Sequence, residues 1–194
     1  MGLRSTSYSA LSLPDAAERI ALDGLALRPF RDADVPLLLD AFADEAMLRW
    51  NPGPDTADGV GEWLRHRNDW SSGDHASWAI AGPDDELAGS VSLHHLDWEQ
   101  RDAEIGYWVA PWTRRRGFGL RGVTAAIRYA FDRIGMHRVY LYHDVANEPS
   151  CRLATALGTR LEGRLRASYR NADGGYHDEH LHALLQQEWQ AATP

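Results

Sequence analysis

The sequence predicts a single domain of the mixed α+β class, with a central sheet flanked by helices. Its 194 residues suffice for one well-cored domain, and no repeat, low-complexity tract or linker divides them. Residues 103–157 read as strand, glycine-containing loop, helix, strand and helix, which is typical of a βαβ unit. Runs with two-residue alternation precede and follow this unit, so antiparallel strands are expected on both sides of it.

Besides a short helix near the N-terminus, the chain up to residue 95 is expected to supply three strands and two helices. Residues 1–24 are polar and irregular, and we expect an N-terminal extension there with one short helix at 15–21. Asp34 is a suitable cap for the apolar periodic run that follows it, and Pro52 and Pro54 end that run. In chain order, the expected elements are a strand at 25–29, helices at 34–48 and 56–70, and a hairpin of strands at 76–81 and 87–95.

The chain from residue 103 is expected to add four strands and two helices. Pro111 stops the first of these strands, and Gly135 has the position of a residue just beyond a helix end. Residues 171–175 read N-A-D-G-G, which predicts a hairpin turn. In chain order, the expected elements are a strand at 103–109, a helix at 118–134, a strand at 138–143, a helix at 149–157 and paired strands at 160–169 and 176–185.

Composition narrows the function classes. Hydrophobic residues make up 44% and charged residues 25%, as in ordinary globular proteins, and no apolar run is long enough to span a bilayer. The formal net charge of −8 disfavours binding to nucleic acid. A single cysteine rules out an internal disulfide, so we expect a cytoplasmic protein with neither a membrane nor a nucleic-acid partner.

The cysteine and the nine histidines do not predict metal chemistry. His177, His180 and His182 fall near one another, but a structural metal site needs about four ligands and no cysteine-rich partner segment exists. We therefore expect no metal. A lone cysteine such as Cys151 in a helix is more often a small buried apolar residue than a nucleophile.

The loop from Arg114 to Gly119, R-R-R-G-F-G, has the composition of an anion site. Glycines let a ligand approach the backbone closely, and the first turn of the next helix offers free N–H groups with partial positive charge. Such an arrangement binds phosphate, although a basic turn on a solvated surface would look the same in sequence. The spacing R-x-x-G-x-G matches neither the dinucleotide fingerprint nor the GxxxxGK[ST] loop.

Further motifs agree with the anion site in both kind and order. They are L-A-L-R-P-F at 25–30, W-A-I at 78–80, L-A-G-S-V at 87–91, A-E-I-G-Y-W-V at 103–109, N-E-P-S at 147–150, L-G at 157–158, L-E-G-R-L-R at 161–166 and H-D at 177–178. Together they resemble the GNAT superfamily of acyl-CoA-dependent N-acyltransferases, and within it the RimJ/RimL branch. The resemblance implies one such domain over 25–194, with about seven strands in a mostly antiparallel mixed sheet, splayed fourth and fifth strands, and about four flanking helices.

The resemblance also implies where acetyl-CoA, the expected co-substrate, would bind. The pyrophosphate would lie on the backbone amides of 115–120, and the pantetheine arm would lie between the splayed strands. There Trp108 and Val109 would hydrogen-bond it, and Val109 N–H would polarise the thioester carbonyl. The implied CoA-binding residues are Trp108, Val109, Arg114, Arg115, Arg116, Gly117, Phe118, Gly119, Leu120, Asn147 and Ser150.

Two residues are candidates for proton transfer in the implied reaction, in which an amine attacks the thioester directly. Glu104 is the expected general base, unless it is a strand residue paired with an arginine such as Arg101. Ser150 is the expected general acid toward the CoA sulfur, unless it only satisfies the helix N-terminus. Some relatives place a carboxylate on the last hairpin, and here Tyr169 aligns with it.

The sequence leaves the amine acceptor open. Trp50 and Tyr107 are the expected acceptor-pocket residues, although tryptophans at such positions also serve as core. The acceptor would be either a protein N-terminal α-amine or a small-molecule amine. The alternatives are a non-catalytic CoA-binding sensor and an acyltransferase that uses a larger donor such as succinyl-CoA. Homodimer formation is a further implication of the resemblance.

Overall fold

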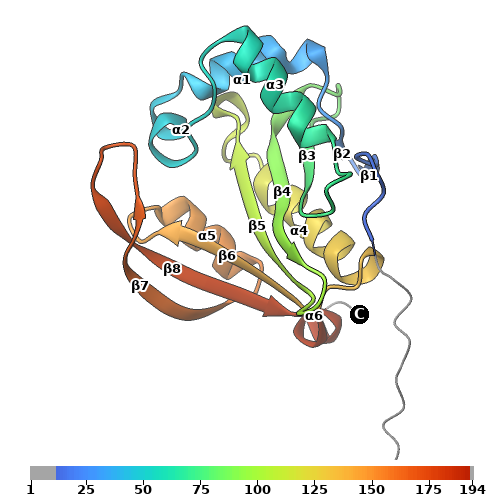
Figure 1. Ribbon diagram of the computed structural model, residues 1–194, viewed down its shortest axis with the longest axis vertical. Helices are drawn as coiled ribbons and strands as arrows, with labels where there is room; N and C mark the ends of the chain where they lie inside the picture. The colour runs from blue at the N-terminus through green and yellow to red at the C-terminus, as the bar shows by residue number, and fades with distance from the viewer. Residues whose placement is uncertain (1–11, 193–194) are drawn as a thin grey trace, which may run out of the picture.

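The computed structural model describes residues 12–192, and Figure 1 shows an open, twisted sheet with helices on both faces. Within these residues the strands are β1 (Ile20–Leu22), β2 (Leu25–Arg28), β3 (Ala76–Ala81), β4 (Leu87–Asp97), β5 (Asp102–Val109), β6 (Arg138–Asp144), β7 (Arg160–Arg170) and β8 (Tyr176–Leu185). The helices are α1 (Val35–Phe42), α2 (Glu45–Trp50), α3 (Ala57–Asn68), α4 (Phe118–Arg128), α5 (Glu148–Ala156) and α6 (Gln186–Ala192). The expected mixed α+β fold is therefore confirmed.

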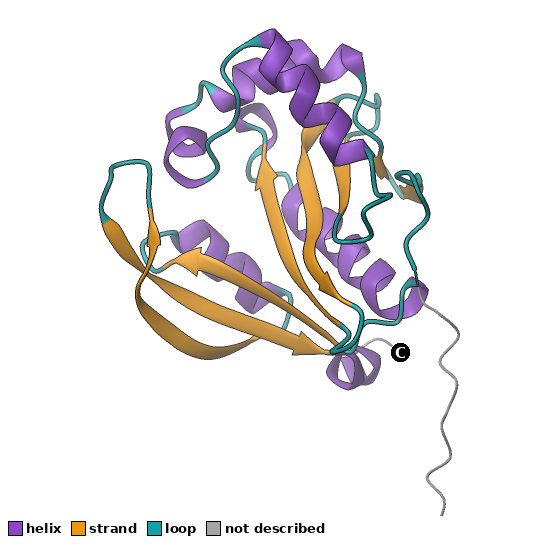
Figure 2. Cartoon of the chain, in the orientation of Figure 1, coloured by secondary structure: helices purple, strands orange, loops and turns teal. Residues whose placement is uncertain are grey.

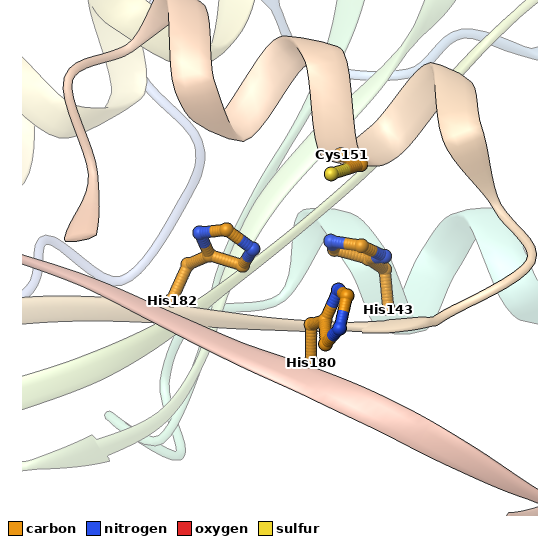
Figure 3. Close-up of side chains that lie close together, drawn as sticks. All are labelled: His143, Cys151, His180 and His182. Carbon is orange, nitrogen blue, oxygen red and sulfur yellow. The ribbon is translucent and has the colours of Figure 1, made fainter. Parts of the chain in front are cut away.

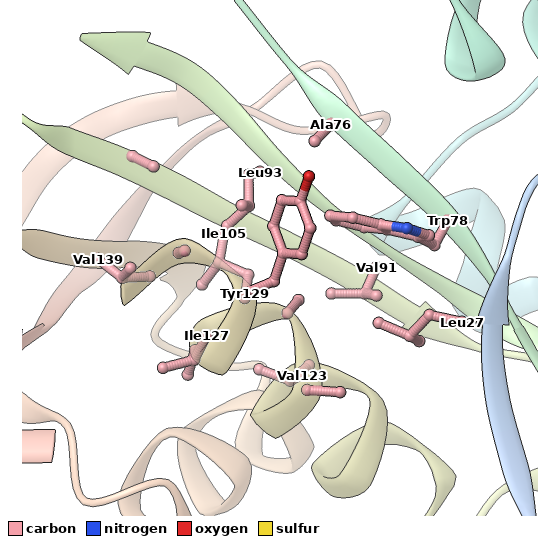
Figure 4. Packing of buried hydrophobic residues seen from close by; sticks show 14 of the residues in the cluster. Leu27, Ala76, Trp78, Val91, Leu93, Ile105, Val123, Ile127, Tyr129 and Val139 are labelled. Atoms are coloured by element: carbon pink, nitrogen blue, oxygen red, sulfur yellow. The ribbon is translucent and has the colours of Figure 1, made fainter. Parts of the chain in front are cut away.

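Two apolar cores, one on each face of the sheet, hold the helices in place. Strand β3 is buried along its whole length and alternates between the cores, with Trp78 and Ile80 facing α4 while Ala79 faces α1 and α3. Figure 4 shows the α4 core, where Tyr129 packs edge-on against Trp78 with ring centroids 5.1 Å apart. Because α4 is fixed on the sheet in this way, the position of its N-terminus is also fixed.

The sheet is antiparallel except at one seam. Its strand order is β1-β2-β3-β4-β5-β6-β8-β7, and among the strands of residues 12–192 only β5 and β6 run parallel. Their register pairs Asp102 with Arg138, Ala103 with Val139 and Glu104 with Tyr140, and no pairing between them continues beyond Glu104. Figure 1 shows the two strands separating from that point. The predicted splay of the fourth and fifth strands is thus confirmed.

The structure corrects several predicted boundaries. The predicted helix at 34–48 is two helices, because Asp44 has an extended backbone and caps α2 by accepting a hydrogen bond from Met47 N–H at 3.2 Å. Residues 15–21 form no helix, since Ile20–Leu22 pairs with β2 as an edge strand. Helix α6 follows β8 directly and was not predicted. The N-terminal extension was placed at 1–24, and its residues 1–11 lie outside the described part of the chain.

A buried ion pair connects the first long strand to the first helix. The Arg28 guanidinium donates to both carboxylate oxygens of Asp34 at 2.8 Å, and both side chains are almost completely buried. Asp85 lies 3.3 Å from Arg28 Nε at the exposed side of the pair. This pair fixes the entry into α1. Within residues 12–192 every helix is too short or too polar to cross a membrane.

Candidate active site

A cavity of about 690 Å³ opens where β5 and β6 separate, a volume typical of small-ligand sites. Figure 2 shows its surroundings, with β5 on one side, β6 and α5 on the other, and α2 nearby. Of the sequence-predicted site residues, Arg116 alone does not line this cavity. The fold thus brings into one cavity residues that lie far apart in the sequence, from Trp50 to Ser150.

The loop before α4 forms the basic end of the cavity. Arg115 and Gly117 both have left-handed backbones, with φ of 62° and 78°, and they turn the chain into the first turn of α4. A Cβ on Gly119 would lie 2.9 Å from Val109 Cγ2, so glycine is needed for α4 to pack this closely on β5. The free amides of the helix terminus therefore lie directly beside the end of β5.

The three arginines of this loop differ in their surroundings. Arg114 is engaged in an ion pair with Asp44, and its guanidinium holds the pKa of that carboxyl below its usual range. Arg116 lies over the ring of Phe118, 5.1 Å from its centroid, and outside the cavity lining. Arg115 lines the cavity and is exposed. Of the three, Arg115 has the placement best suited to an anionic ligand.

Beyond Glu104, the edge of β5 that faces the cavity has no strand partner among the described residues. Ala110 N–H donates to the carbonyl of Ala88 on the β4 side at 2.9 Å. Because N–H directions alternate along a strand, the N–H groups of Val109 and Tyr107 point away from β4, and that of Trp108 points toward it. The Trp108 ring is buried against Phe42. An extended ligand arm would accordingly pair with Val109 and Tyr107 rather than with Trp108.

Tyr107 and Ser150 meet across the cavity. Their hydroxyl oxygens are 2.6 Å apart, one carried by β5 and the other by the first turn of α5. Asn147 caps that helix, and its side-chain oxygen accepts a hydrogen bond from Ser150 N–H at 3.2 Å. Burial raises the pKa of Tyr107 to about 12, so its phenol keeps its proton at neutral pH. The pair thus places two hydrogen-bonded hydroxyl groups in the lining of the cavity.

Glu104 lies at the last paired position of the seam and lines the cavity. Burial raises the pKa of its carboxyl above the ordinary value, and the nearby Glu179 carboxylate raises it further. His95 opposes this shift from 3.9 Å away. A carboxylate with a raised pKa is better suited to accept a proton from an ammonium group than an ordinary glutamate.

The cavity lining contains two further titratable side chains: Glu179, which sequence reasoning did not single out, and His94, which it left as either a lining or an exposed residue. Glu179 lines it from β8 and accepts a hydrogen bond from Ser168 Oγ at 2.9 Å. His94 lines it from β4, and burial lowers the pKa of its imidazole to about 4, which keeps it neutral. Gly106 permits this position, because a Cβ there would lie 2.8 Å from His94 Nε2. Only the cross-strand register reveals these neighbours, since His94 pairs with Glu104.

Another part of the cavity lining combines aromatic rings with carboxylates. Trp50 lines the wall from the end of α2, with the Arg49 guanidinium 4.3 Å from its ring centroid. Tyr142 and Tyr169 contribute further rings, and both are partly exposed. With the glutamates, these rings form a surface that suits a cationic group.

The fold and the site together define an acyl-transfer class of enzyme. Comparison with protein families agrees, because residues 25–160 match the acetyltransferase (GNAT) domain model. The chain belongs to this family and is an N-acetyltransferase-type enzyme of the RimJ/RimL-like kind. This outcome does not favour the alternative of a sensor without catalysis.

Similar proteins are acetyltransferases by name. YdaF of Bacillus subtilis, provisionally named as a ribosomal N-acetyltransferase, is 36% identical over 107 residues, or 55% of this chain and 58% of YdaF. The chain thus spans little more than half of that relative. The spermidine N(1)-acetyltransferase of Escherichia coli K12 is 30% identical over 95 residues, or 46% of this chain and 51% of that protein.

Solved structures confirm the fold. A crystal structure of a probable acetyltransferase superposes with a TM-score of 0.78 at 26% identity, covering 89% of this chain and 99% of that one. A dodecameric spermidine N-acetyltransferase from Vibrio cholerae superposes with a TM-score of 0.71 at 20% identity, covering 89% and 100%. The second likeness, at its low identity, concerns the fold alone.

Proposed function

We propose that the protein transfers the acetyl group of acetyl-CoA to a primary amine by direct attack within a ternary complex. The observation that carries the proposal is the cavity between β5 and β6, which has an arginine-bearing helix N-terminus at one end and carboxylates at the other. The first end suits a pyrophosphate and the second suits an ammonium group. The unpaired edge of β5 connects the two.

The donor end has the features that a CoA substrate requires. Gly117 leaves open space where a Cβ would project, and the first turn of α4 lies beside it. Arg115 and the α4 amides would hold the pyrophosphate, and Tyr107 and Val109 would pair with the pantetheine arm. Asn147 would contact the same arm from α5. Val109 N–H would also stabilise the negative charge that develops on the thioester oxygen.

Proton transfer is assigned to two groups on opposite sides of the reacting atoms. Glu104 would take a proton from the acceptor ammonium, directly or through a water molecule, with Glu179 as a second carboxylate at the same end. Ser150, hydrogen-bonded to Tyr107, would donate to the departing sulfur, and Tyr107 would replace that proton. The raised pKa of Glu104 supports its role as proton acceptor, whereas Tyr107 is protonated at neutral pH and would regain its proton from water after the transfer.

The acceptor is assigned as a cationic amine. Glu104 and Glu179, with the rings of Trp50 and Tyr169, support a polyamine-like small molecule. The name of the E. coli relative is consistent with that choice, whereas the name of YdaF points to a ribosomal acceptor. Both acceptor classes present a primary amine to the same carboxylates, so a substrate assay must decide between them.

A thiol-release assay tests the proposal. Acetyl-CoA or succinyl-CoA is supplied with spermidine, with single amino acids, or with short peptides that have a free N-terminus. We expect release of free CoA with acetyl-CoA and spermidine, together with the acetylated amine in mass spectra. Acetyl-CoA binding without turnover on any of these amines would contradict the proposal and favour a sensor. Turnover with succinyl-CoA alone would reassign the donor.

Self-association is a separate part of the proposal. The dodecameric assembly of the V. cholerae spermidine N-acetyltransferase supports it for a chain of this fold. Light scattering coupled to size-exclusion chromatography would determine the mass in solution, and a monomer at all concentrations would refute this part.

A further inference from the structure

A cluster of three histidines and the cysteine lies beside the cavity, whose lining includes His143 of the cluster and Ser150, the neighbour of Cys151. His143 is on β6, His180 and His182 share one face of β8, and Cys151 faces them from α5. Strand register places His143 directly opposite His180. One potential ligand atom from each residue lies within 4.8 Å of all the others. Figure 3 shows the rings and the thiol directed at a common centre.

Three nitrogens of this cluster have no hydrogen-bond partner among residues 12–192. His143 Nε2, His180 Nδ1 and His182 Nε2 are all buried and unpaired, and the side chains of His143 and His182 are more than nine-tenths buried. Buried polar atoms in folded proteins are almost always paired, so three unpaired nitrogens at one place require an explanation. A cation that accepts their lone pairs would supply one.

One ring is held in the tautomer that leaves its buried nitrogen free to bind a metal, and the contact of a second ring favours the same tautomer. His143 Nδ1 lies 2.9 Å from the carbonyl of Asp144, and a carbonyl can only accept, so the proton is on Nδ1 and Nε2 has a lone pair. Thr159 donates its hydroxyl proton to the carbonyl of Ala154, so its oxygen faces His182 Nδ1 as an acceptor at 3.5 Å. A second partner that fixes the tautomer in this way is typical of metal-ligating histidines.

We propose that His143, Cys151, His180 and His182 form a binding site for a divalent transition metal of the zinc type. Three imidazoles and one thiolate are the ligands of a closed tetrahedral zinc site. With metal–nitrogen distances of about 2.0 Å and a metal–sulfur distance of about 2.3 Å, the ligand atoms would be about 3.3 to 3.6 Å apart. The present outer limit of 4.8 Å therefore requires small side-chain rotations toward the centre.

The site would be structural rather than catalytic, because four protein ligands leave no position for substrate. Its ligands come from β6, β8 and α5, so a metal would cross-link the helix to the two strands beneath it. Cys151 follows Ser150 directly, and the cross-link would hold the hydroxyl in register with Tyr107. This inference does not rest on the proposed acetyl transfer, and its test measures metal binding alone.

The experiment uses the full chain without a histidine tag, stripped with a chelator and reloaded with Zn²⁺ or Co²⁺. After desalting, elemental analysis is expected to find one zinc per chain, and Zn²⁺ is expected to raise the melting temperature. The Co²⁺ form is expected to show tetrahedral visible bands and a thiolate charge-transfer band. Because Cys151 is the only cysteine in the sequence, that band identifies it as a ligand.

Variants decide whether the metal is at this cluster. Cys151→Ala should remove the charge-transfer band, and His182→Gln should abolish retention of zinc. His137→Gln changes an exposed histidine outside the cluster and should leave one zinc per chain. If the unaltered chain retains no metal and shows no cobalt band, the proposal is wrong. It is equally wrong if zinc retention survives both cluster variants, and Cys151→Ala keeps the test valid where His182→Gln fails to fold.

Discussion

The phenol oxygen of Tyr107 lies 2.6 Å from the hydroxyl of Ser150, although the two residues are 43 positions apart in the chain. One belongs to β5 and the other to α5, so this hydrogen bond spans the opening between the two halves of the sheet. It also supports the proposed role of Tyr107 in proton transfer, beside its predicted contact with the acceptor. The bond provides the sharpest test of the proposed chemistry.

Replacing Tyr107 by phenylalanine keeps the ring and removes the hydroxyl. We expect kcat to fall about 10- to 100-fold with little change in the KM for acetyl-CoA, because the proton relay is lost while the pantetheine edge remains. Steady-state thiol release measures both constants. Tyr142→Phe, which changes another phenol of the cavity lining, should retain activity, and an equal loss in both variants would argue against the relay.

Glu104→Gln removes the expected base. We expect kcat to fall about 100-fold or more. The pKa of Glu104 is raised, so in the unaltered enzyme activity should be lost as pH falls through a value above the ordinary glutamate range, where the carboxylate becomes protonated. The pH–rate profile of the variant should lack this loss of activity at low pH. Glu99→Gln, an exposed control, should keep it, and an unchanged profile in Glu104→Gln would exclude this residue.

Arg115→Ala should weaken acetyl-CoA binding more than Arg116→Ala, although the two arginines are adjacent. Arg115 lines the cavity, whereas Arg116 lies over Phe118 outside it. Loss of a hydrogen bond to a charged phosphate corresponds to about 1.5 to 3 kcal/mol, or roughly a 10- to 100-fold rise in Kd. Isothermal titration calorimetry measures both variants. A larger loss in Arg116→Ala would show that the cradle uses a different arginine.

Asp34→Ala should destabilise the fold without touching the cavity. The substitution leaves the Arg28 guanidinium buried without its main partner, and removal of one member of a buried ion pair costs about 3 to 5 kcal/mol. We expect the lower end, because Asp85 remains near Arg28. Urea denaturation measures the change. Glu162→Ala, which breaks the more exposed pair with Arg138, should cost less than about 1 kcal/mol.

Sequence patterns predicted most of the fold because its central elements are long and strongly periodic. The run from 118 to 134 was predicted as one helix, and it is continuous in the structure as α4 followed by a π-helical turn, with Gly135 at φ 68° just after it. Strand β1 escaped prediction because three residues show too little alternation. The break before α2 was missed because Asp44 lies inside an apolar periodic stretch.

The site was predictable where it depends on local backbone and not where it depends on register. The loop at 114–120 is indicated by its glycines and arginines. Asn147 is indicated by its position before a helix, where a capping residue is expected. The contact of Tyr107 with Ser150 and the pairing of His94 with Glu104 arise only from how strands align. The cluster of His143, Cys151 and two β8 histidines likewise draws on three elements, so no single spacing could reveal it.

The short seam between β5 and β6 has a further consequence. Strands β1 to β5 are joined to β6, β8 and β7 by three register pairs, the last of which is at Glu104. The C-terminal leaf, residues 138–185, should therefore open as a cooperative unit of its own, with amide hydrogens that exchange while those of β3 and β4 stay protected. The width of the cleft between β5 and β6 would then change as this leaf moves. The angle between the leaf and the rest of the sheet would limit the size of the acceptor.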